Sequence, residues 1–153
     1  MLKNLTKLVV TVATFCAMSC QLFAQGVTVI QGEGVATAIN PFQFAGTGVA
    51  RIGHDKVSES SLATLTSLNP GPGGSLVGTS THTIQFGARG TITTTDELRL
   101  VPVNDQGLYV LSIKSAIVSG TGDFAGVNGE LTFNGFANLA TGQVTWKLHG
   151  QYR

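Results

Sequence analysis

The connectors between the apolar runs constrain the fold of this chain most strongly, because none is long enough to hold a crossover helix. Runs rich in β-branched residues, with partial alternation of apolar and polar positions, follow one another from residue 27 to residue 152. The segments between them contain Gly, Pro and Asn, which are typical of turns. Parallel neighbours need a connection of about a dozen residues or more. The sequence therefore predicts an all-β protein built from antiparallel hairpins.

Eight strands are predicted. Their expected ranges are Val27 to Ile39, Phe44 to His54, Glu59 to Leu68, Leu76 to Gly87, Thr91 to Val103, Leu108 to Val118, Glu130 to Ala137 and Gln143 to Tyr152. An open sheet of sequential hairpins has two exposed edges, and closure removes them. We therefore expect an eight-stranded antiparallel up-and-down barrel over residues 25–153, with a β-sandwich as the alternative. The interior of such a barrel is either filled by side chains or holds one small ligand.

Residues 1–24 have the pattern of a signal peptide. Lys3 and Lys7 precede an uncharged, mostly apolar run from Leu8 to Met18, and Ala24 puts a small residue before a plausible cleavage point. The apolar run is too short for a comfortable membrane span. We expect export to the periplasm or the cell exterior. As an alternative, the four residues that end at Cys20 form a lipoprotein-type cleavage box, which would make Cys20 an acylated N-terminus.

The composition that remains after this leader excludes several classes of protein. Without Lys3 and Lys7, the nine Lys and Arg residues fall to seven against eight Asp and Glu, a net charge of −1 that gives no footprint for nucleic acid. Both cysteines, Cys16 and Cys20, lie in the leader, so the expected mature domain has no disulfide and no Cys ligand. The three histidines are scattered and lack metal-site spacing. We expect neither a metal nor a cofactor.

The hairpin after the fourth predicted strand suggests a pair of polar residues inside the barrel. A three-residue loop Ala88-Arg89-Gly90 would place His82 directly opposite Asp96, both on the more apolar face. Directly opposite Cβ atoms lie about 5 Å apart, so an imidazole–carboxylate hydrogen bond is expected. Such a pair is suited to general acid–base catalysis on a ligand. The structural alternative is that the two buried polar groups simply satisfy one another.

Two further residues are candidates for contact with a ligand. Glu33 shares its parity with the apolar Val35 on the first predicted strand, so we expect its carboxylate to point inward. The structural alternative for Glu33 is a carboxylate near an open barrel end. Trp146 shares its parity with Leu148 on the last strand, which makes it a core residue first and a ligand platform second.

The segment GTGDFAGVNG, at residues 120–129, is rich in glycine but joins two predicted strands, with no helix to receive a phosphate group. Together with ELTFNG, THTIQF, GTITTTDELRLVPV and NLATGQVTWKLHGQYR, it resembles the allene oxide cyclase and dirigent-type barrel superfamily, in a bacterial exported branch. The resemblance implies an eight-stranded barrel with a hydrophobic cavity. Plant members cyclise an unstable epoxide or steer phenoxy radical coupling, often as trimers. No catalytic residue carries over, because no catalytic motif of those enzymes aligns here.

Three functional classes follow from these observations. The first is a non-enzymatic exported barrel that binds a small apolar or aromatic molecule or serves as a secreted structural module. The second is a small cyclase or isomerase in which His82 and Asp96 move a proton. The third is an outer-membrane barrel, although one Trp and two Tyr are too few for two aromatic girdles. A homotrimer is expected if the outer faces of some strands are apolar.

Overall fold

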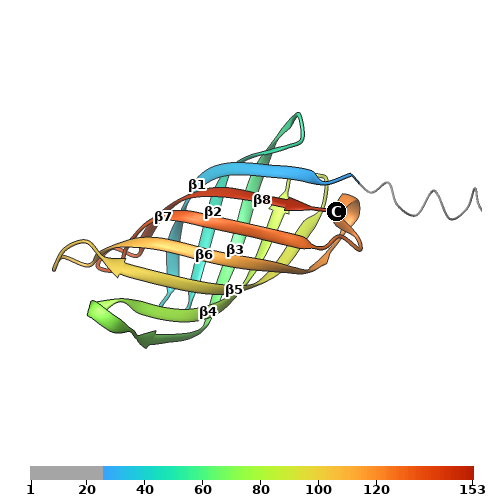
Figure 1. The fold of residues 1–153 in the computed structure, drawn as a ribbon. Coiled ribbons are helices and arrows are strands. Elements are labelled where there is room, and N and C mark those ends of the chain that lie inside the picture. Colours follow the sequence, from blue (N-terminus) through green and yellow to red (C-terminus); the bar gives the residue numbers. More distant parts are fainter. Residues whose placement is uncertain (1–25) are drawn as a thin grey trace, which may run out of the picture.

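The computed structural model describes residues 26–153, which form a closed barrel of eight antiparallel strands in chain order (Figure 1). The strands are β1 (Thr28–Asn40), β2 (Gln43–Ile52), β3 (Asp55–Pro70), β4 (Leu76–Phe86), β5 (Thr91–Pro102), β6 (Leu108–Gly120), β7 (Gly129–Asn138) and β8 (Gln143–Tyr152). Two short 3₁₀ turns, η2 (Pro72–Gly74) and η3 (Gly122–Phe124), lie in connections. The predicted barrel is confirmed. The predicted signal peptide and the alternative acylation site at Cys20 lie outside the described residues.

The barrel closes because its first strand pairs with its last. β1 is bonded to β2 on one side and to β8 on the other, with Thr28 opposite Tyr152 and Thr37 opposite Gln143. All other neighbours are consecutive hairpins, so no strand is left at an edge. The alternative of a two-sheet sandwich is therefore wrong.

The main difference from the predicted strand ranges lies between β2 and β3. The expected second strand extends to His54, whereas β2 ends at Ile52, which pairs directly with Asp55. Gly53 takes a left-handed backbone conformation, with φ of 61°, that suits glycine in a tight turn. β3 therefore begins four residues before the predicted start at Glu59.

The two ends of the barrel differ, and we name them by their connections. The closed end carries the connections β2–β3, β4–β5 and β6–β7, and the open end carries β1–β2, β3–β4, β5–β6 and β7–β8. The largest apolar cluster fills the closed half, and its members are Ile30, Ala50, Ile52, Ile84, Phe86, Ile92, Ile117, Phe124, Leu131, Phe133, Trp146 and Leu148. A smaller cluster in the open half contains Leu98, Leu100, Leu111 and Ala137. The core is thus concentrated at one end.

Small residues on β1 and β2 make room for the indole ring of Trp146. Gly34 and Gly48 lie opposite each other on these strands, and Gly34 is also opposite Trp146 on β8. A Cβ atom at either glycine would overlap the indole ring. The Trp146 side chain is 7 % exposed and therefore fills the interior space that β1 and β2 leave empty.

Candidate functional site: a cavity in the open half

The β4–β5 hairpin differs from its predicted register by two residues. In the structure His82 lies opposite Thr94, and Asp96 lies opposite Ser80. The three-residue loop is residues 87–89, because the Phe86 N–H donates to the Gly90 carbonyl at 2.9 Å. The predicted direct pairing of His82 with Asp96 is wrong. A shift of two residues preserves the face of every side chain, so both residues still point into the barrel.

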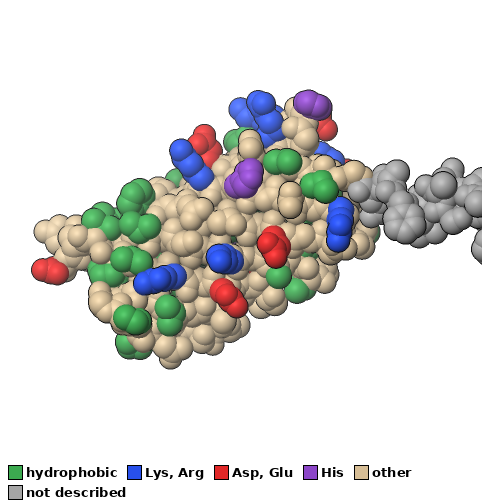
Figure 2. All heavy atoms as spheres, in the orientation of Figure 1, with side chains coloured by type: hydrophobic (Ala, Val, Ile, Leu, Met, Phe, Trp, Pro, Cys, Tyr) green, Lys and Arg blue, Asp and Glu red, His purple; other side chains and the backbone are tan. Residues whose placement is uncertain are grey.

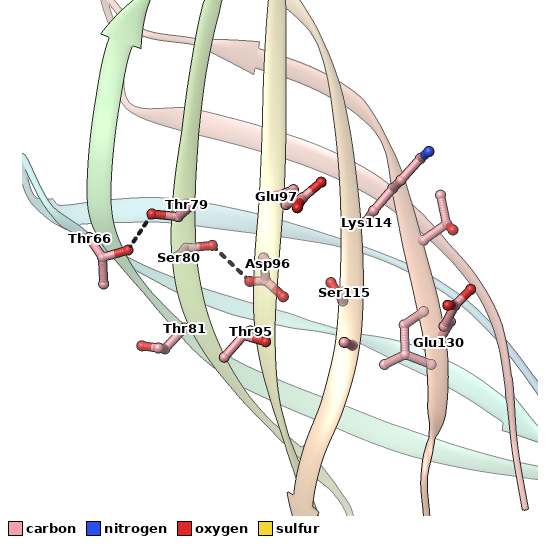
Figure 3. Close-up of a pocket in the computed structure, with 13 residues that line it drawn as sticks. Thr66, Thr79, Ser80, Thr81, Thr95, Asp96, Glu97, Lys114, Ser115 and Glu130 are labelled. Atoms are coloured by element: carbon pink, nitrogen blue, oxygen red, sulfur yellow. Dashed lines mark hydrogen bonds between the residues drawn. The ribbon is translucent and has the colours of Figure 1, made fainter.

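Hydroxyl groups satisfy the buried Asp96 carboxylate. Asp96 is 3 % exposed, and it accepts hydrogen bonds from Ser80 Oγ at 2.7 Å and from Thr94 Oγ1 at 2.6 Å. Figure 3 shows the bond between Ser80 on β4 and Asp96 on β5, with Ser115 of β6 on the other side. Each carboxylate oxygen accepts one of these hydroxyl protons. These two hydroxyl bonds to Asp96 therefore stand in place of the imidazole–carboxylate hydrogen bond that the sequence predicts.

His82 is buried without a partner for one of its ring nitrogens. The residue is 8 % exposed, and its Nδ1 atom has no hydrogen-bond partner. Its ring lies against Phe133, with ring centroids 5.2 Å apart. Burial lowers the pKa of His82 below its ordinary value, and the negative charge of Asp96 opposes this shift only in part. The imidazole is therefore neutral at pH 7.

A cavity of about 100 Å³ lies in the open half of the barrel. Its wall is mostly aliphatic and aromatic, with contributions from Leu65, Leu68, Leu98, Leu100, Leu111, Ile113, Leu139, Val144, Phe133 and Trp146. Three polar residues share the lining, namely Ser61, Ser80 and His82. An apolar wall with a few polar groups is the usual form of a small-molecule site.

His82 marks the inner end of this cavity. Ser80 and His82 of β4 line it. The next inward-facing residues on that strand, Ile84 and Phe86, belong to the larger apolar cluster of the closed half. Phe133 and Trp146 belong to both the cavity wall and that cluster. The cavity therefore ends where the closed-end core begins. Trp146 is buried, as predicted, and forms part of this inner wall.

The interior position predicted for Glu33 is wrong. Glu33 is exposed, and Val35, which has the same parity on β1, is 54 % exposed. The inward positions of this strand are instead Gly32, Gly34 and Ala36. The physical reason is the indole ring of Trp146, which occupies the volume that larger inward side chains would need. Glu33 therefore lies on the outer face, away from the cavity.

Glu59 is a buried ionisable residue that the sequence did not single out. It is 3 % exposed on β3, and neither carboxyl oxygen has a hydrogen-bond partner. Burial raises the pKa of Glu59 to about 8, because desolvation penalises the charged form. Its alternation with Val57 and Ser61 on β3 is the one signal that could have placed it inside.

A second hollow lies on the outside of the barrel. This groove of about 630 Å³ follows β3 to β7, and its lining includes five threonines together with Glu97, Lys114 and Glu130 (Figure 3). Hydroxyl groups bond within it, as at Thr66 and Thr79, whose Oγ1 atoms are 2.7 Å apart. The groove is open and polar, whereas the interior cavity is apolar, so the cavity is the better candidate for a small-molecule site.

Two further observations concern residues 26–153. In this part of the chain, no group of three or more His, Cys, Asp or Glu side chains is arranged to hold a metal ion. The same residues form no helix that is both long and apolar enough to cross a membrane.

No protein-family model matches the sequence, and neither a curated protein nor a solved structure matches it.

Proposed function

We propose that this protein is an exported barrel that binds one small apolar or aromatic molecule in its open half. The observation that carries the proposal is the cavity of about 100 Å³ in the open half, which is lined by the smaller apolar cluster and by His82. An engineered apolar cavity of about 150 Å³ in another protein binds benzene, so a space of this size suits a small ring or a short chain. A larger molecule would have to extend through the open end.

The open end itself supports entry of an apolar molecule. Large hydrophobic side chains are exposed around it, and they include Ile39, Phe42, Leu68, Val103 and Leu139. Among residues 40–43, 70–76, 102–108 and 138–143, which form the connections at this end, Asp105 is the one charged residue. Figure 2 shows hydrophobic side chains gathered at this end of the barrel. An apolar rim with little charge does not repel an apolar ligand.

Export and family membership are parts of the same proposal. We propose that residues 1–24 are removed as a signal peptide and that the domain belongs to the allene oxide cyclase and dirigent-type superfamily, as its Gly-rich segment suggests. The closed eight-stranded antiparallel barrel is the architecture that this resemblance implies. Acylation at Cys20 is the alternative fate of the N-terminus.

A homo-oligomer, such as a trimer, is also proposed, on the basis of an apolar stripe on the outer face. Val35, Phe136, Val110 and Val101 occupy one continuous register row, with Thr145 between the first two. They are 54 %, 51 %, 44 % and 41 % exposed, respectively. Contiguous apolar patches on a monomer are rarely larger than a few hundred Å². Light scattering of the purified protein measures the oligomeric state directly.

The outer face is a poor match for an outer-membrane barrel. Its exposed residues include Glu33, Glu97, Lys114 and Lys147, on four different strands. A lipid-facing band is apolar, and a charge at its centre costs about 2–4 kcal/mol. The interior, in contrast, contains the apolar clusters. This pattern favours a barrel surrounded by water.

A cyclase or isomerase is the second candidate, and the unpartnered ring nitrogen of His82 beside the cavity favours it. A general base must reach its substrate, and the His82 residue lines the cavity. Its weakness is that Asp96 is bonded to Ser80 and Thr94, so no carboxylate orients the imidazole. Turnover that is lost in His82→Ala, while ligand affinity and fold persist, would establish this function.

The test of the proposed function is native mass spectrometry of the protein isolated from its own cells, followed by organic extraction and identification of bound molecules. We expect one apolar or aromatic molecule per chain. Leu98→Phe, which fills part of the cavity, should release that molecule, whereas Thr95→Phe on the outer face of the same strand should retain it. A barrel that is isolated empty and binds no apolar probe would overturn the proposal.

A further inference from the structure

We propose that the ligand of this cavity is an uncharged amphiphile that places one hydroxyl group against His82, with its apolar body pointing toward the open end. The inference rests on the proposed function and names the class of ligand more closely.

The unpartnered Nδ1 atom of His82 carries the argument. Buried polar groups in folded proteins almost always have a hydrogen-bond partner. Nδ1 has none and is itself enclosed by protein atoms, although the residue as a whole is 8 % exposed and lines the inner end of the cavity. The hydroxyls of Ser80 and Thr94 cannot donate to Nδ1, because their protons are donated to Asp96. Rotation of the imidazole about its Cβ–Cγ bond would turn Nδ1 toward the cavity, where a polar atom of the ligand would complete the site.

The charges around the site favour a neutral group. Burial keeps the His82 imidazole uncharged, so it offers one N–H donor and one acceptor nitrogen. The Asp96 carboxylate, whose charge acts on His82, would repel a ligand anion. The aliphatic wall would penalise a cation, because an isolated charge loses its hydration there. A hydroxyl group both donates and accepts, so it fits either tautomer of His82.

The walls set the size of the apolar part. Phe133 and Trp146 flank the inner end, and Leu98 and Leu111 lie on the side walls. In about 100 Å³ this arrangement suits a five-membered carbon ring or a chain of similar volume.

Trp146 makes the site observable, because it is the single tryptophan of the chain and lines the cavity. Its fluorescence can be followed while the full chain is titrated with cyclopentanol or with chlorocyclopentane, which has the same ring but no hydrogen-bond donor. We expect cyclopentanol to bind about tenfold more tightly, although it is the less hydrophobic of the two. Hydrophobicity alone predicts the opposite order.

Substitutions assign this preference to His82. His82→Phe should reverse the order of the two affinities, and His82→Gln, which keeps a hydrogen-bonding group, should restore part of it. The control is His149→Phe, which alters an exposed histidine on β8 and should leave both affinities unchanged. If His82→Phe does not fold, the ¹⁵N shift of the His82 ring in the unmodified protein replaces it. That shift should move with cyclopentanol and stay constant with chlorocyclopentane.

The outcomes separate this inference from the proposed function. Tighter binding of chlorocyclopentane, or equal binding of both probes, would overturn the hydroxyl requirement and leave an apolar binding barrel. That result would also mean that a water molecule can satisfy Nδ1 equally well. Failure of both probes to change Trp146 fluorescence at saturating concentrations would overturn the inference and argue against the proposed function as well.

Discussion

The two ends of the barrel are built from the same alternating strands, yet one is filled and the other holds a cavity. At the closed end, Phe86, Ile92 and Phe124 are 0 % exposed, and they pack in the larger cluster. At the open end, Leu98 and Leu100 are 7 % and 5 % exposed and border the cavity. Strands and connections both contribute to this difference. At the open end, small strand side chains such as Ala36, Ala63 and Ser80 line the cavity, whereas at the closed end a connection returns an aromatic side chain to the core.

The β6–β7 connection provides this side chain, Phe124, and we call it the plug of the closed end. Gly122 and Gly126 have left-handed backbone conformations, which let the η3 turn direct Phe124 inward. The Phe124 ring lies between two aromatic rings, 5.4 Å from that of Phe86 and 5.6 Å from that of Tyr152 between centroids. The Arg89 guanidinium carbon lies 5.9 Å from the centroid of the Phe124 ring. Charged and aromatic groups thus hold the loop over this end.

The turns at the open end reverse the chain without filling the barrel. Asn40, Asn104 and Asn138 each accept a backbone N–H bond, of 2.9 to 3.0 Å, from the residue two positions later. These Asx turns satisfy the backbone locally. The hydrophobic residues beside them, such as Phe42, remain exposed at the rim. These turns contribute Leu139 to the cavity wall, but none supplies a fully buried ring like that of Phe124.

Removal of the plug should have the largest effect on stability. Phe124→Ala is expected to lower the free energy of unfolding by about 3–5 kcal/mol, because it removes a fully buried ring and leaves a void. Denaturant unfolding of the full chain measures this loss. Phe42→Ala, at a side chain that is 65 % exposed in the β1–β2 connection, is the control and should change stability by about 0.5 kcal/mol or less. Equal losses would contradict the contrast between plug and surface.

Glu59→Gln should stabilise the protein in a pH-dependent way. The folded protein keeps its proton up to a pKa of about 8, whereas the unfolded chain loses it near 4.5, so stability falls as pH rises between these values. At pH 7 this deficit amounts to about 3 kcal/mol, which the neutral glutamine removes. Unfolding between pH 4 and pH 9 measures the slope.

The matched control for this slope is Glu33→Gln, which replaces an exposed carboxylate on the outer face. This variant should leave the dependence of stability on pH unchanged. A slope that persists in Glu59→Gln would show that another group causes it.

A core truncation at the open end should cost less than the loss of Phe124. Leu100→Ala is expected to lower the free energy of unfolding by about 2 kcal/mol, near the lower limit for such changes, because this side chain already borders empty space. The same variant should enlarge the cavity and shift its preference from cyclopentanol to cyclohexanol, measured by Trp146 fluorescence. A loss greater than that of Phe124→Ala would remove the distinction between the two ends.

The smallest effect is expected at the ion pairs of the closed end. Arg89 Nε lies 2.9 Å from Asp123 Oδ2, and its Nη1 lies 3.5 Å from Asp55 Oδ2, in partly exposed surroundings. Arg89→Ala should therefore lower the free energy of unfolding by about 1 kcal/mol, and less at high salt. Arg99→Ala, on the exposed face of β5, is the control and should have little effect. Identical salt dependence in the two variants would contradict this role.

The sequence predicted the barrel because its evidence is local. Turn residues and alternation lie within each hairpin, and they need no knowledge of distant neighbours. The β4–β5 register failed for a local reason as well, because Gly87 and Gly90 both have positive φ and permit two different three-residue loops. A shift of two residues kept His82 and Asp96 inside but changed their partners.

The remaining errors have causes that are distant in sequence. The apolar parity of Glu33 predicts an inward position, but the interior beside β1 is occupied by Trp146, more than a hundred residues later. The partners of Asp96 depended on the register, so the cavity and the unpartnered nitrogen of His82 could not be derived from the sequence. The burial of Glu59 is not predicted from the sequence, because a buried carboxyl without a partner is rare.

The bonding of β1 to β8 also has a consequence for when the protein can fold. Thr28 pairs with Tyr152, so the barrel cannot close until the ribosome has synthesised β8. Pairing between such distant residues is slow to form. A nascent chain that stops short of β8 exposes the edges of β1 and β7, which are templates for aggregation. For the export that we propose, late closure would keep the chain unfolded until its synthesis is complete. A chain truncated before β8 should accumulate as aggregate.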